Sequence, residues 1–90
     1  MRRHYVVSGR VQGVGFRQFT AEKSRGLKIS GWVKNLPDGK VEAEAQGSED
    51  ELRAFEKILR AGPALSRVDV VEMQNLEDDS DLPLHFEIRR

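Results

Sequence analysis

The stretch from Gly9 to Arg17 constrains the fold of this chain most, because it joins an apolar run to a segment with helical character. Tyr5-Val6-Val7 precedes it, and glycines at positions 9, 13 and 15 allow the backbone to take positive φ angles. A curled glycine-rich turn that opens a helix presents successive backbone N–H groups and the positive end of the helix dipole. We therefore expect a strand, a turn suited to an anion, and a helix.

Arg17 falls in the first turn of that expected helix, where the helix dipole disfavours a cation by about 0.3–1 kcal/mol. A bound anion would cancel this cost, and a guanidinium offers phosphate or carboxylate oxygens a planar fork of donors. Glycine turns that bind nothing and solvated first-turn arginines are also common, so both interpretations stay open at this point. The turn lacks the third glycine of a dinucleotide fingerprint and the Gly-Lys-Ser/Thr of a nucleotide P-loop.

Hydrophobic periodicity predicts two helices. In the first, apolar positions share one arc with Lys23, whose aliphatic stem can cover the edge of the core. These positions are Phe16, Phe19, Thr20 and Leu27. The second begins with a capping box formed by Ser48 and Glu51 and stops at Gly62-Pro63. Its apolar stripe consists of Leu52, Phe55 and Leu59, with Ile58 beside it.

Five strands are predicted, over residues 5–11, 29–36, 40–46, 67–73 and 84–88. The third alternates apolar and polar residues, which is typical of a sheet that is buried on one face. The short turn at 37–39 makes the second and third strands an antiparallel hairpin. The acidic run at 77–81 lacks the spacing of a calcium-binding EF-hand loop and predicts a solvated loop.

The order of these elements predicts the fold class. Strand, helix, strand, strand, helix, strand is the α+β, ferredoxin-like split βαβ plan (βαββαβ): an antiparallel sheet with two helices on one face. Here a short extra C-terminal strand follows. Ninety residues suffice for one core, so we expect a single domain over residues 1–90. Many functions use this fold, so the fold alone decides little.

Composition excludes several function classes. The chain has 15 basic and 15 acidic residues, so no overall charge draws it to nucleic acid or to an anionic membrane. It has no cysteine, hence no disulfide, thiolate nucleophile or cysteine-based zinc site, and this is compatible with the cytoplasm. Its apolar runs are too short for a signal peptide or a membrane span. We expect a cytoplasmic monomer without nucleic-acid or membrane partners.

A second informative stretch, Gly31-Trp32-Val33-Lys34-Asn35, lies near the end of the predicted strand 29–36. In the split βαβ plan the first two strands run parallel, so their ends lie on the same side of the sheet. The Asn35 amide can therefore approach the glycine turn. Taken alone, an asparagine at such a place more often bonds to its own backbone in a turn.

Together the two stretches resemble the acylphosphatase family, over roughly residues 5–88. The first family pattern, Gly-x-Val-Gln-Gly-Val-x-Phe-Arg, is matched by Gly9, Val11, Gln12, Gly13, Val14, Phe16 and Arg17. The second is matched by Gly31, Trp32, Val33, Lys34, Asn35, Gly39, Val41 and Gly47. Many relatives have Leu-Gly-Leu ahead of the second pattern, where this chain has Leu27-Lys28-Ile29. Lys28 thus puts the end of the first helix in doubt, but not the site.

The resemblance implies hydrolysis of a small acyl phosphate to a carboxylate and inorganic phosphate, with no metal and no cofactor. It implies that Arg17 and the N–H groups of the turn bind the phosphoryl group, while Asn35 orients the attacking water. The turn residues are Gln12, Gly13, Val14, Gly15, Phe16 and Arg17. The leaving carboxylate has a conjugate-acid pKa of about 4 and departs without a proton, so the reaction needs no general acid. Accordingly His4 and His85 lie outside both motifs.

Three alternatives remain. RNA-recognition domains share the βαββαβ plan, although the aromatics near Phe16 and Phe19 fall at a helix start rather than on central strands. An idle domain could sense phosphate with the same turn, although the presence of both Arg17 and Asn35 favours an enzyme. A regulatory domain of a larger enzyme that uses carbamoyl phosphate would predict flanking metal-binding or transferase segments, and the sequence shows none.

Overall fold

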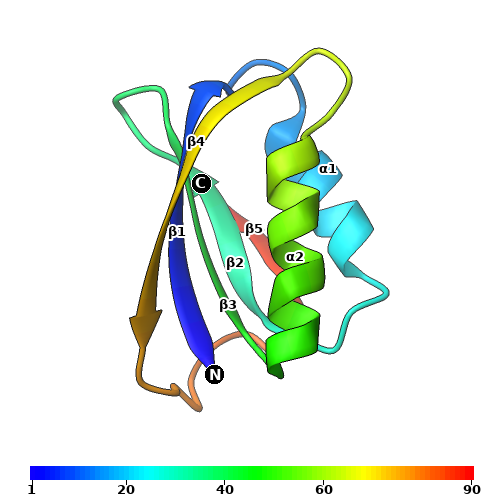
Figure 1. Cartoon of the computed structure of the whole chain (residues 1–90), viewed down its shortest axis with the longest axis vertical. Helices are drawn as coiled ribbons and strands as arrows, with labels where there is room; N and C mark the ends of the chain where they lie inside the picture. The colour runs from blue at the N-terminus through cyan, green and yellow to red at the C-terminus, as the bar shows by residue number, and fades with distance from the viewer.

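The computed structural model describes residues 1–90 as a five-stranded sheet with two helices on one face (Figure 1). The sheet order is β4-β1-β3-β2-β5. The elements are β1 (Arg2–Arg10), α1 (Phe16–Ser24), β2 (Ser30–Asn35), β3 (Val41–Gln46), α2 (Glu49–Ala61), β4 (Arg67–Leu76) and β5 (Glu87–Arg89). The predicted ferredoxin-like α+β class is confirmed, with one refinement: β5 pairs parallel with β2, so the sheet is mixed rather than wholly antiparallel.

Several strand ends differ from the predicted ones because ladder hydrogen bonds also hold polar residues. β1 begins at Arg2, which lies opposite Gln46 of β3 and Leu76 of β4. The same pairing carries β4 to Leu76, beyond the predicted end at residue 73. β5 is shorter than predicted and shifted toward the C-terminus, over Glu87–Arg89 rather than residues 84–88. Hydrophobic periodicity does not register such polar pairings.

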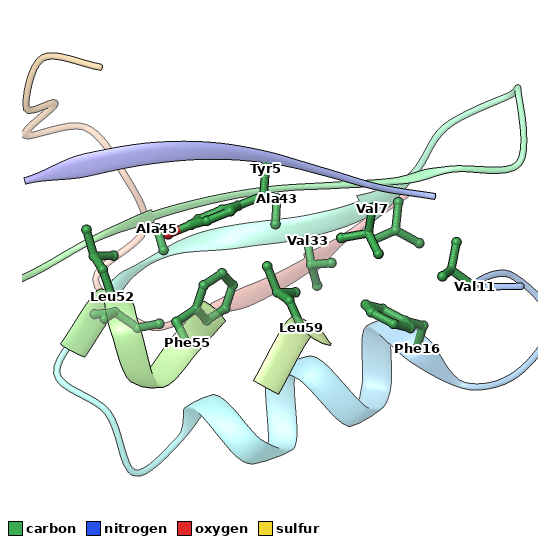
Figure 2. Close-up of a cluster of buried hydrophobic side chains, with 12 residues drawn as sticks. Tyr5, Val7, Val11, Phe16, Val33, Ala43, Ala45, Leu52, Phe55 and Leu59 are labelled. Carbon is green, nitrogen blue, oxygen red and sulfur yellow. The ribbon is translucent and has the colours of Figure 1, made fainter. Parts of the chain in front are cut away.

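The core lies between the sheet and the helices. Figure 2 shows the alternate side chains of β3, Ala43 and Ala45, facing the α2 stripe of Leu52, Phe55 and Leu59. All five side chains are fully buried, which confirms the predicted inner face of β3 and the predicted stripe of the second helix. The core therefore fixes α2 against the centre of the sheet.

The predicted buried arc of the first helix is wrong in part. The residues that α1 buries are Phe16, Thr20, Ala21 and Ser24. Thr20 can be buried because its hydroxyl donates to the Phe16 carbonyl at 2.8 Å. Phe19 is only half-buried, and Leu27 lies beyond the helix end.

The doubt about Lys28 is resolved by the way α1 ends. The helix stops at Ser24, and the capping residue Arg25 keeps a right-handed conformation. The Leu27 N–H donates to the Ser24 carbonyl at 3.0 Å, and the Lys28 N–H donates to a Glu51 carboxylate at 3.1 Å. The end of the helix therefore requires no left-handed glycine at position 28.

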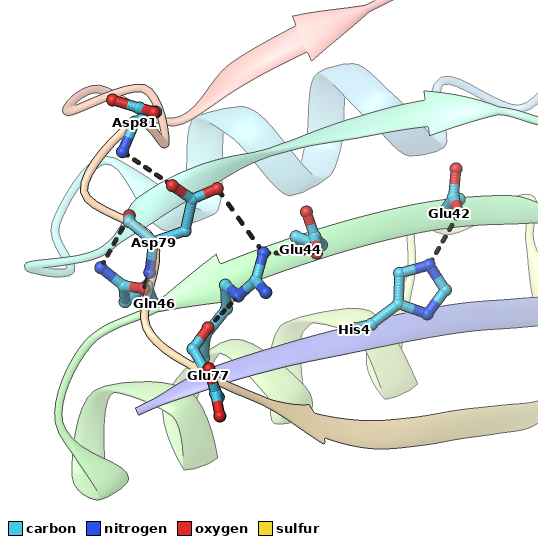
Figure 3. A network of polar contacts seen from close by, with 8 residues as sticks. His4, Glu42, Glu44, Gln46, Glu77, Asp79 and Asp81 are labelled. Atoms are coloured by element: carbon cyan, nitrogen blue, oxygen red, sulfur yellow. Dashed lines mark hydrogen bonds and ion pairs between the residues drawn. The ribbon is translucent and has the colours of Figure 1, made fainter.

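The sheet face away from the helices, which we call the open face, carries a polar network (Figure 3). His4 Nε2 lies 2.7 Å from Glu42 Oε2, and Lys34 Nζ lies 3.4 Å from Glu42 Oε1. Burial by itself raises the pKa of Glu42, but the bonds from His4 and Lys34 lower it overall. At one end of this face, Gln46 exchanges two hydrogen bonds with the backbone of Asp79 and so fastens the acidic loop.

Neither helix has the length and apolar character that a bilayer span requires.

Candidate active site

A concave pocket of about 340 Å³ opens where β1 passes into α1. β2 and β5 reach the same end of the molecule, at the top in Figure 1. The pocket is lined by Val11, Gln12, Gly13, Gly15, Phe16, Arg17, Gln18, Asn35, Ile88 and Arg90. The structure thus brings Arg17, Asn35 and the glycine turn together, although nearly twenty residues separate Arg17 from Asn35 in the sequence. The lining includes cations and amides but no carboxylate side chain.

The glycines of the turn shape its backbone. Gly13 and Gly15 have φ angles of 74° and 77°, and an added Cβ at either position would meet no atom within 4 Å. The turn therefore needs glycine for its left-handed conformation and not for space. Within the chain, none of the backbone N–H groups of residues 12–18 donates a hydrogen bond. The glycine turn and the first turn of α1 thus leave a run of unpaired backbone donors in the segment that borders the pocket.

Arg17 lies in the first turn of α1 and is half-buried. Its only hydrogen bond within the chain runs from Nη1 to the carbonyl oxygen of Arg89, at 3.2 Å. A carbonyl oxygen carries no full charge, so the guanidinium keeps its positive charge uncompensated by any carboxylate. Most of its donors remain available to a bound oxyanion.

Asn35 is the last residue of β2 and lies opposite Val41 in the ladder. Its side chain is half-buried at the pocket wall, and it does not form the bond to its own backbone that is typical of asparagines in turns. The carboxamide is therefore held at the pocket by a strand and retains both its donors and its acceptor for a ligand.

The Gln12 side chain makes a contact that the sequence did not reveal. Its side-chain amide donates to the carbonyls of Leu36 and Lys40, at 2.7 and 2.8 Å. These carbonyls belong to the β2–β3 connection, which directly follows Asn35. Gln12 therefore ties the glycine turn to the strand end that carries Asn35. Hydrophobic patterning gave no signal for this contact.

β5 and the residue after it also contribute to the pocket wall, through Ile88 and Arg90. Sequence reasoning placed no site residue in this segment. It has no motif, and more than seventy residues separate it from Arg17.

The structure contains no group of three or more His, Asp or Glu side chains placed to hold a metal ion.

Comparison with known proteins supplies independent information. A sequence profile described as acylphosphatase matches residues 3–88. An acylphosphatase of Anaeromyxobacter dehalogenans is 49% identical over 99% of this chain and 95% of its own. The crystal structure of acylphosphatase from Bacillus subtilis superposes with a TM-score of 0.92 at 35% identity, covering 99% of this chain and 98% of that one.

The same fold also occurs within a larger protein. Full-length HypF, solved in a phosphate- and nucleotide-bound form, gives a TM-score of 0.82 at 26% identity over 99% of this chain but only 12% of its own. By contrast, the Anaeromyxobacter relative and the Bacillus structure are matched over nearly their entire length. The family profile, the sequence identity and the superposition agree, and the chain belongs to the acylphosphatase family.

Proposed function

We propose that this protein is an acylphosphatase that hydrolyses small acyl phosphates at the pocket between the glycine turn and Asn35. The observation that carries the proposal is the meeting of three unsatisfied groups: the free N–H groups of residues 12–18, the uncompensated Arg17 guanidinium and the Asn35 carboxamide. The first two suit a phosphoryl group, and the third suits a water molecule. In this arrangement the turn residues Gln12, Gly13, Val14, Gly15 and Phe16 act through their backbone.

The charge of the substrate matches the charge of the pocket. A phosphoryl group carries up to two negative charges, and Arg17, the N–H dipoles and the positive end of α1 can stabilise them together. No Asp or Glu side chain lines the pocket to oppose the anion. We infer that these groups also stabilise the charge that develops in the transition state, so that the reaction proceeds without a metal or another cofactor.

The chemical step is one displacement at phosphorus. The oxygen of water forms a bond to phosphorus, and the bond from phosphorus to the acyl oxygen breaks with its electron pair. The carboxylate leaves without protonation, because its conjugate acid has a pKa of about 4. Since a neutral amide cannot accept a proton, Asn35 orients the water while the proton passes to a substrate oxygen or to bulk solvent. Positioning and charge stabilisation supply the catalysis.

We further infer that residues 1–90 act as one domain and as a cytoplasmic monomer. One continuous cluster of buried side chains supports the single domain. The zero net charge and the ion-paired open face support a protein that does not recruit nucleic acid or a membrane.

The test is an assay of benzoyl phosphate hydrolysis in excess EDTA, with an RNA-binding titration on the same preparation. We expect hydrolysis that EDTA leaves unchanged, its loss in Arg17→Ala, and no affinity for RNA. Arg25→Ala is the matched control, because it removes the same charge from the opposite, exposed end of α1. RNA binding without hydrolysis would support a recognition domain instead, and phosphate binding without hydrolysis would support a sensor.

A further inference from the structure

The orientation of Arg17 depends on a distant part of the chain. Its guanidinium finds no acceptor in the glycine turn or in α1, and its single bond goes to the Arg89 carbonyl of β5. The contacts that hold β5 in place therefore also fix the position of the Arg17 Nη1 group. An arginine held in this way loses less conformational freedom when an oxyanion binds.

β5 is a weak element by itself. It has three residues, all exposed, and it lies at the edge of the sheet, where it pairs only with β2. A three-residue parallel ladder leaves one side of the strand without backbone partners. A further contact is needed to hold the Arg89 carbonyl at a fixed place.

Trp32 of β2 supplies this contact. It lies opposite Glu87 in the ladder, and the Arg89 guanidinium carbon lies 5.0 Å from the centre of the indole ring. Trp32 is only 7% exposed although it belongs to the open face, so the stacked guanidinium of Arg89 covers the indole ring, while its own outer side stays in solvent. Glu87 accepts a bond from Arg89 Nε at 2.9 Å and holds the guanidinium over the ring.

Lys34 places a second cation 5.4 Å from the same ring. Lys34 forms an ion pair with Glu42 at 3.4 Å, and Arg89 forms one with Glu87. These two ion pairs reduce the repulsion between the cations on either side of the ring. Trp32 thus couples β2, whose last residue is Asn35, to the strand whose carbonyl holds Arg17.

We propose that Trp32 is a positioning residue of the pocket: by stacking on Arg89 it holds β5 in place, and the Arg89 carbonyl in turn aims Arg17 at the bound phosphoryl group. The inference rests on the proposed function for its substrate, but the affinity for inorganic phosphate tests it without any chemistry. A tryptophan that only packed on the sheet would affect stability alone.

The test compares Trp32→Leu, Trp32→Phe and the control Val6→Ala. Val6 is a half-buried side chain of β1 that pairs with β3 and β4 and lies far from β5 in the sheet order. For Trp32→Leu we expect the Kd for inorganic phosphate and the KM for benzoyl phosphate to rise together, by roughly fivefold to thirtyfold, and kcat to fall as well, because a misplaced Arg17 stabilises the developing charge less. Trp32→Phe keeps an aromatic face and should restore most of the affinity. Val6→Ala should leave Kd and KM unchanged at a comparable loss of thermal stability.

A double-mutant cycle identifies the route of the effect. Arg89→Ala keeps the backbone carbonyl but removes the stacked guanidinium, so it should weaken phosphate binding as Trp32→Leu does, and the two changes together should add nothing further. Additive effects, or a Trp32→Leu variant with the phosphate affinity of the unmodified protein, would overturn the proposal. If the unmodified protein bound phosphate but hydrolysed no acyl phosphate, the proposed function would fail, whereas the Kd comparison would still decide the role of Trp32.

Discussion

The starts of the two helices differ in almost every respect that governs helix stability. At α2, the Ser48 hydroxyl accepts the Glu51 N–H at 3.2 Å, and acidic residues fill the first turn. At α1, the capping residue is Gly15 in a left-handed conformation, no side chain caps the helix, and no acid lies in the first turn. Arg17 stands there instead, at the positive end of the helix dipole.

The difference is consistent with the proposed anion-binding role of the α1 start and with a structural role of the α2 start. α2 satisfies the Glu51 N–H through the Ser48 hydroxyl and complements its dipole with acidic residues, as a structural helix does. α1 leaves the same groups free and adds a cation, which weakens it in the free protein. Proteins commonly break local rules of this kind at functional sites. The buried ring of Phe16 and the bond from Phe19 N–H to the Gly15 carbonyl, at 2.9 Å, keep the helix in place nonetheless.

The largest effect is expected at the start of α1. Arg17→Ala should lower kcat/KM for benzoyl phosphate by at least about 10²–10³, because it removes a preorganised donor from the developing charge. The free protein should keep its thermal stability or gain slightly, because a cation leaves the positive end of the helix. Steady-state kinetics and thermal unfolding in phosphate-free buffer measure the two quantities.

Arg17→Lys is the informative companion. It retains the charge but not the planar fork, and we expect it to restore little of the activity. If the lysine variant regained most of the rate, the positive charge alone would explain the role of this residue. The planar geometry of the guanidinium would then no longer distinguish the start of α1 from that of α2.

Asn35→Ala should have the next largest effect on activity. It distinguishes anion binding by the start of α1 from orientation of the attacking water by the last residue of β2. We expect kcat to fall by roughly 10²-fold, because misplacing a reacting water has consequences of that size. The Kd for inorganic phosphate should stay close to that of the unmodified protein, since the anion is held by the turn and Arg17. An equal loss in Kd and in kcat would show that Asn35 binds the phosphoryl group itself.

The sequence predicted much of this arrangement. Capping at Ser48, alternation in β3 and the glycine turn follow local rules, and the structure confirms each of them. The expected site residues line one pocket with the exception of Val14, whose side chain packs against the core, and their roles remain predictions. The missed features depend on long-range contacts: Gln12 reaches the Leu36 carbonyl, and the Arg89 carbonyl reaches Arg17 across the fold. Every residue has a backbone carbonyl whatever its side chain. A hydrogen bond to a particular carbonyl therefore cannot be predicted from the residue types in the sequence.

Inorganic phosphate should stabilise the folded protein through the open start of α1. At a concentration of 100 times its Kd, a ligand that binds only the folded state adds about 2.7 kcal/mol to the free energy of unfolding. We expect a rise in Tm of the unmodified protein along a phosphate titration at constant ionic strength. Arg17→Ala should show little of this rise. An equal rise in that variant would place the stabilising anion elsewhere on the molecule.

The smallest effect is expected at α2. Ser48→Ala removes the hydroxyl that accepts the Glu51 N–H and should lower the free energy of unfolding by about 1 kcal/mol. The acidic first turn and the buried stripe of α2 remain, so the helix still forms. Because this helix start contributes no group to the pocket, kcat and KM should stay unchanged at temperatures well below the unfolding transition.

Urea titration measures the free energy of unfolding, and steady-state kinetics on the same preparation measure kcat and KM. A loss of activity at unchanged folded fraction would mean that the α2 start also serves the site, and the division between a structural and a binding helix start would then fail.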